Sequence, residues 1–131
     1  MSDTRYDQEE DQRLAITAEV LYLTNLLLLP GIAFFILLWL FFRHRNSQLS
    51  LARCHLRQTV SASIWAGIIL VVVNILIILL GGYAAAATWV IVILYFVTAH
   101  AALVLLGTLG LARAMAGKHY HYTLVGVACP E

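Results

Sequence analysis

The sequence predicts an all-α integral membrane protein with about three transmembrane helices, the first broken or kinked at Pro30-Gly31, and a short interfacial amphipathic helix. The chain is 62% hydrophobic and only 11% charged, whereas soluble domains carry roughly 25% charged residues. Residues 60–80 and 84–112 contain no Asp, Glu, Lys or Arg, and each exceeds the ~20 apolar residues that cross a membrane. The net charge of +1 gives no electrostatic support for nucleic-acid binding.

Residues 1–13 form a polar tail that contains five acidic residues. We expect this tail to be solvated and disordered, or to become helical only near its end. The acidic cluster from Asp7 to Asp11 suits a helix N-terminus, where the macrodipole favours anions.

Residues 14–42 form the first apolar segment, and they begin the helical membrane domain expected over residues 14–116. A straight helix of this length would be about 43 Å long, and Pro30 predicts a break or kink near its middle. Three shapes fit: one kinked, tilted helix, an interfacial helix leading into a span, or a re-entrant pair. We favour a kinked helix with its first turns in the interface, which places Glu19 near headgroup depth. A deeper Glu19 would need a partner and would become a functional candidate.

Residues 43–58, RHRNSQLSLARCHLRQ, contain four of the eight Lys and Arg residues. An amphipathic helix is expected here, continuing over residues 48–80 into the second span. Arg53 and Arg57 stand at i,i+4, where like charges repel slightly, so we expect them to contact anionic lipid headgroups or an acidic partner.

The second span has a small-residue face and one strongly polar side chain, Asn74. Because an unpaired amide in hydrocarbon is costly, Asn74 is expected to hydrogen-bond across to another helix, in this chain or in a partner. Gly81-Gly82-Tyr83 predicts a tight turn into a third span at residues 84–116. Residues 117–131 are expected to lie on the membrane surface as an interfacial tail, anchored by aromatic residues such as Tyr120 and Tyr122.

The basic residues predict the orientation of the chain. With three spans, the 43–58 loop and the C-terminus share the side that carries six of the eight Lys and Arg residues. The positive-inside rule places that side in the cytoplasm. The acidic N-terminus would then be outside, unless residues 14–42 re-enter.

Two motifs resemble a known family. LARCHLRQTV contains an H-x-x-Q pattern, His55 to Gln58, that leads into a span, and GKHYHYTLVG follows the last span. Together with LLPG and WLFF they resemble the DUF4870, Tic20-like family of small bacterial inner-membrane proteins, over residues 19–126. Thr123 stands where the family commonly has proline. The resemblance implies a small helical inner-membrane protein without an assigned reaction.

His100 is the main candidate for cofactor binding, because an ionisable residue inside a membrane indicates function. Haem, quinone or pigment contact is one interpretation, and a neutral His100 hydrogen-bonded within a helix bundle is the other. Haem shared between His55 and His100 is disfavoured, since the two differ by about 12 Å in depth along their helices. No catalytic residue, metal site or resident cofactor is predicted; His119, His121 and Cys129 are the alternative, as ligands of a surface metal site. Cys54 and Cys129 are expected to be free thiols.

Three functions remain open. The leading hypothesis is a non-catalytic accessory or assembly subunit of a larger inner-membrane complex. The second is a redox-linked subunit using His100, and the third is a homo-oligomeric transport component. The expected contacts with the lipid bilayer or with other membrane subunits involve Arg53, His55, Arg57, Gln58, Asn74, His100, Tyr120 and Tyr122.

Overall fold

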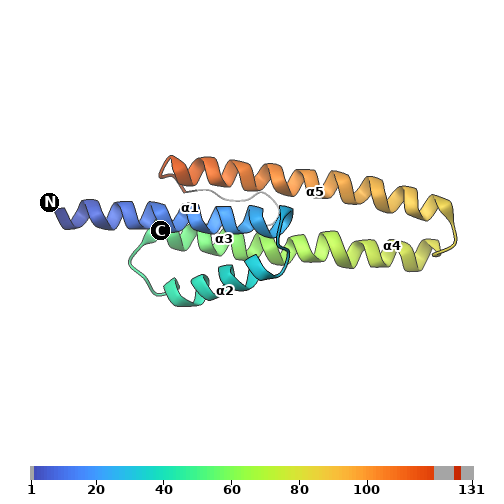
Figure 1. Cartoon of the computed structure of the whole chain (residues 1–131), viewed down its shortest axis with the longest axis horizontal. Helices are drawn as coiled ribbons and strands as arrows, with labels where there is room; N and C mark the ends of the chain where they lie inside the picture. Colours follow the sequence, from blue (N-terminus) through green and yellow to red (C-terminus); the bar gives the residue numbers. More distant parts are fainter. Residues whose placement is uncertain (1, 120–125, 128–131) are drawn as a thin grey trace.

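The computed structural model describes residues 2–119 and 126–127, and within that part every regular element is a helix. In chain order they are α1 (Ser2–Leu27), α2 (Ile32–His44), α3 (Ser50–Gly67), the π-helical turn η1 (Ile68–Val72), α4 (Val73–Gly81) and α5 (Ala86–Met115). Figure 1 shows two helical hairpins of unequal length. The short one, α1–α2, packs against α3 and α5 and turns near the middle of the long one. The long hairpin pairs α3, η1 and α4 with α5.

The chain reverses direction between α1 and α2. Pro30 cannot continue a helix, and Gly31 follows it with φ +92°, a conformation that favours glycine. The Gly31 backbone N–H donates to Oδ1 of Asn25, 2.9 Å away. The break predicted at Pro30-Gly31 is therefore confirmed, whereas the favoured shape, one kinked helix, is wrong. Of the three predicted shapes, the reversal fits the re-entrant pair.

The predicted disordered tail is also wrong, because α1 begins at Ser2. Two side chains tie this part of α1 to its neighbours. The Asp11 carboxylate accepts hydrogen bonds from the backbone N–H groups of Leu51 (3.1 Å) and Ala52 (2.6 Å), at the start of α3. Nε2 of Gln12 donates to the Met115 carbonyl at the end of α5, 2.6 Å away. These bonds satisfy backbone groups that helix ends leave without partners.

The amphipathic segment predicted to continue over residues 48–80 into the second span does continue as one helix, Ser50–Gly81, of 32 residues. No helix breaker stands between Gln58 and Val60, and both α1 and α2 pack on α3. The turn at Gly82, with φ +86°, reverses the chain as predicted. A Cβ added at Gly81 would lie 2.5 Å from Oγ1 of Thr88, so the two helices meet closely there.

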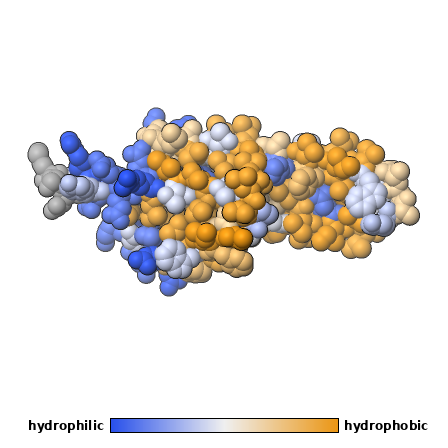
Figure 2. Space-filling view, in the orientation of Figure 1, coloured by the Kyte–Doolittle hydropathy of each residue, from blue (hydrophilic) through white to orange (hydrophobic). Residues whose placement is uncertain are grey.

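By length and composition, two described helices could cross a membrane, where the sequence predicted about three spans. They are Ser50–Gly81 and Ala86–Met115, and α2 is shorter. Small residues allow the helices to pack where both hairpins lie together, with Ala18 of α1 and Ala62 of α3 fully buried. Beyond the α1–α2 turn the long hairpin continues alone. On the face that Figure 2 shows, hydrophilic residues gather at the end where α1 begins, and hydrophobic residues cover most of the rest.

Candidate functional site: a buried polar cluster

Glu19 of α1 and His55 of α3 form a pair inside the bundle. The Glu19 Oε1 atom lies 2.5 Å from Nδ1 of His55, and both side chains are fully buried. Tyr22 follows Glu19 by one helical turn and is buried. Gln58 and Thr59 follow His55 by one turn and are buried as well. We call these five residues the buried polar cluster.

The hydrogen bonds of His55 define how many protons the pair holds. Nε2 lies 2.9 Å from the Lys118 carbonyl oxygen, which can only accept, so Nε2 carries a hydrogen. Nδ1 faces a carboxylate oxygen, and a second hydrogen lies between these two atoms. Whether that proton belongs to the imidazole or to the carboxyl group, the pair is neutral overall. Neutrality limits the cost of burying two ionisable groups.

The cluster also binds the chain that follows α5. His55 bonds the Lys118 carbonyl, and the Gln58 amide both donates to the Val127 carbonyl and accepts from the Val127 N–H, 3.2 Å away. The H-x-x-Q motif places these two side chains on one helix face. His55 and Gln58 were predicted to contact a partner or lipid. In the structure both are fully buried and bond within the chain.

Tyr22 and Thr59 complete the cluster. The Tyr22 hydroxyl donates to the Leu103 carbonyl of α5 at 3.3 Å, and the Thr59 hydroxyl donates to the His55 carbonyl at 2.8 Å. Close approach of α5 to α1 depends on Gly107, where an added Cβ would lie 2.7 Å from both the Tyr22 ring and the Leu23 side chain.

His100 lies apart from the cluster, on α5. Its Nε2 is 3.0 Å from the Leu26 carbonyl, in the last turn of α1. Its ring stacks on Phe96 with centroids 5.6 Å apart and 8° between the planes. Because a carbonyl only accepts, Nε2 carries the hydrogen of this bond. His100 therefore satisfies a carbonyl at the end of α1, and ligation of a metal through Nε2 would require that bond to break.

Asn74 was predicted to bond across to another helix, and this is wrong for the described chain. Its Nδ2 donates to the Leu70 carbonyl of the same helix, 2.6 Å away. Its Oδ1 is buried and has no hydrogen-bond partner. The alternative prediction, a bond to a partner helix, stays a prediction.

The other predicted contact residues are dispersed. Arg53 is half-buried and donates to the Ser47 carbonyl at 3.0 Å, while Arg57 is exposed. Tyr120 and Tyr122 lie outside the described residues, as do His121 and Cys129. Within residues 2–119 and 126–127, no group of three or more His, Cys, Asp or Glu side chains could hold a metal ion.

Cys54 is disulfide-bonded in the structure, so the predicted free thiol at this position is wrong. The prediction relied on the cytoplasmic location inferred for both cysteines. Lys118 and Val127, which follow α5, both bond side chains of α3, and spacing in the sequence did not reveal these contacts.

Asp11, Gln12 and Tyr22 were missed as structural contacts. The available signal was polar side chains one turn apart in apolar segments, as at Glu19 and Tyr22 or at His55 and Gln58.

Comparisons of the chain with protein-family models, curated proteins and solved structures found no match.

Proposed function

We propose that this chain is an integral protein of the bacterial inner membrane, with two spans, Ser50–Gly81 and Ala86–Met115. In this arrangement α1–α2 is a re-entrant hairpin that enters the membrane and returns to the same side. The most apolar windows of both long helices are only 11% buried in the structure. The core helix of a soluble protein would be mostly buried, so these surfaces favour a lipid environment. The basic α2–α3 connection supports a cytoplasmic location for that end.

Single cysteines test this topology in a chain whose two native cysteines are replaced by serine. Glu9→Cys and Gln48→Cys should react with a membrane-impermeant maleimide from the cytoplasmic side, and Tyr83→Cys only from the opposite side. Labelling of Glu9→Cys and Gln48→Cys from opposite sides would contradict the re-entrant hairpin. Release of the protein from membranes by alkaline carbonate would contradict membrane insertion itself.

Within the membrane, we propose a non-catalytic role as an accessory or assembly subunit of a larger complex. The observation that carries this proposal is the outer half of the long hairpin, which neither α1 nor α2 covers. Large apolar side chains are exposed there on both helices, including Leu76, Leu79, Ile93 and Leu94. The buried acceptor of Asn74 lies in the same half. The other buried polar side chains described above form hydrogen bonds within this chain, which favours a structural use over a chemical one.

Extraction from native membranes in mild detergent tests the assembly role. We expect a particle much heavier than the 14.5 kDa chain, containing unrelated subunits that copurify in constant ratio. A lone chain in the native extract would contradict this role, while a ring of identical chains with solute flux in liposomes would favour the transport alternative.

The redox alternative is less well supported, because the Nε2–H of His100 already donates to Leu26. We expect His100→Ala to leave the visible absorbance of the purified particle unchanged. A Soret band lost in this variant would overturn that assignment.

A further inference from the structure

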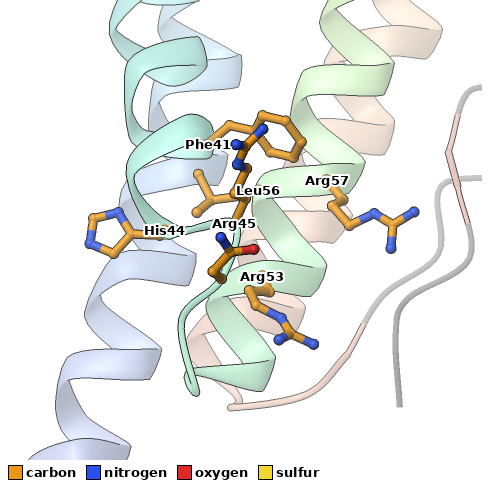
Figure 3. A pocket seen from close by; sticks show the side chains of 7 residues that line it. Phe41, His44, Arg45, Arg53, Leu56 and Arg57 are labelled. Carbon is orange, nitrogen blue, oxygen red and sulfur yellow. The ribbon is translucent and has the colours of Figure 1, made fainter.

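A basic cavity of about 470 Å³ lies between the end of α2 and the start of α3. Figure 3 shows that Arg53 and Arg57 project from the same side of α3, while His44 extends away from them on α2. The polar lining is completed by Arg45 and Asn46 from the connecting turn, and the apolar lining comes from Phe41 and Leu56.

The three arginines of this cavity have positive charge that the described chain does not neutralise. Among the described residues, the only ion pair is Glu19–His55. Arg53 uses one donor on the Ser47 carbonyl, and the Arg45 guanidinium lies 5.8 Å from the centre of the Phe42 ring. A guanidinium has five N–H donors, so most of them are available to an anion. Phosphate suits them because its oxygens match the fork of arginine donors.

A second cavity, of about 320 Å³, adjoins the first and shares Phe41 and Arg57 with it. Its other lining residues are mainly apolar and include Val60, Ile64 and Trp65. Arg53, Arg57, Val60 and Ile64 follow helical spacing, so they share one face of α3. Along that face the side chains change from basic to apolar with distance from the charged end of the molecule.

We propose that these two cavities form a binding site for one anionic phospholipid. The phosphate occupies the basic cavity, and an acyl chain lies along the apolar cavity between Phe41 and Trp65. A free anion would need only the basic cavity. A phospholipid joins a charged group to a long apolar chain, so it matches the basic cavity together with the apolar cavity beside it. This inference rests on the membrane location proposed above.

The test uses the full chain, recovered from membranes in mild detergent and examined by native mass spectrometry with added phosphatidylglycerol or phosphatidylcholine. We expect preferential retention of phosphatidylglycerol. Arg53→Gln/Arg57→Gln should weaken it by about tenfold or more, since each charge-assisted contact is worth about a tenfold change or more in affinity. Arg45→Gln, an exposed change in the turn, should weaken it with less risk to folding. The matched control is Arg113→Gln, which removes one exposed cation from α5.

A second pair of variants examines the acyl-chain cavity. Trp65→Ala should reduce retention, whereas Trp39→Ala, an exposed tryptophan outside both cavities, should not. Equal retention by the arginine variants and the Arg113→Gln control would overturn the site. If millimolar inorganic phosphate displaced the lipid fully and Trp65→Ala had no effect, the basic cavity would bind a free anion. That result would overturn the proposed phospholipid site. A chain absent from the membrane fraction would instead contradict the proposed location.

Discussion

The Glu19 carboxylate and the His55 imidazole are 2.5 Å apart in the interior of the bundle, although 36 positions separate them in the sequence. Through its other nitrogen, the same ring bonds the Lys118 carbonyl. One side chain therefore joins α1, α3 and the segment after α5. Glu19 and His55 therefore have a structural role, which can be tested without knowing any partner subunit.

Removing either member of this pair should destabilise the protein strongly. We expect Glu19→Ala and His55→Ala each to lower the free energy of unfolding by about 3–5 kcal/mol, because each leaves a buried ionisable group without its partner. Denaturant titration in micelles measures this loss, and Glu10→Ala, at an exposed acid of α1, is the control. The double variant should lose at least about 1 kcal/mol less than the sum of the two. Additive losses would show that the pair is not coupled.

Asp11 should stabilise the start of α3. Asp11→Ala removes the acceptor for two backbone N–H groups, so we expect a loss of about 1–2 kcal/mol in unfolding free energy. Asp11→Asn retains one side-chain oxygen and should cost less. The comparison is Asp7→Ala, which removes an exposed acid one helical turn earlier. If Asp7→Ala and Asp11→Ala unfold at the same temperature, Asp11 does not cap α3.

Gly107 should tolerate no larger residue. Gly107→Ala introduces a Cβ 2.7 Å from Tyr22 and Leu23, and such overpacking typically costs about 1–3 kcal/mol. At Gly67 nothing lies within 4 Å of an added Cβ, so Gly67→Ala should be neutral or stabilise α3 by up to about 1 kcal/mol. Thermal unfolding followed by circular dichroism compares the two. A more stable Gly107→Ala variant would mean that α1 and α5 lie farther apart.

Asn74 should matter more for assembly than for folding. Its Oδ1 has no hydrogen-bond partner, so Asn74→Leu should change the stability of the isolated chain by less than about 1 kcal/mol. The yield of the large particle should nevertheless fall, and Asn74→Gln should preserve more of it. Quantitative recovery of copurifying subunits is the measurement. Equal yields from both variants would remove the proposed contact with a partner helix.

Local sequence signals predicted the long helices well. The segment expected at residues 84–116 is Ala86–Met115, and the glycine turn before it was expected as well. Periodicity and the absence of charge are sufficient there, because each signal acts within one helix.

The shape of residues 14–42 was harder to predict, because proline gives the same local signal for a kinked helix and for a reversal of the chain. The Asn25–Gly31 bond and the packing of α1 on α3 and α5 accompany the reversal, and both depend on the folded chain. The Glu19–His55 pair could not be predicted from the sequence for the same reason. Spacing predicts which residues share a helix face, but the partner of that face depends on the path of α1.

The two proposed spans are an even number, and the α1–α2 hairpin begins and ends at the charged end of the molecule. This arrangement determines which segments would have to cross the membrane when the chain is inserted during synthesis. Only the tip at residues 81–85 would have to pass through the hydrocarbon, and it carries no charge. A three-span path would instead place a segment with five acidic residues on the far side of the membrane. The two-span path proposed above would keep every Lys and Arg on the side where the ribosome releases the chain.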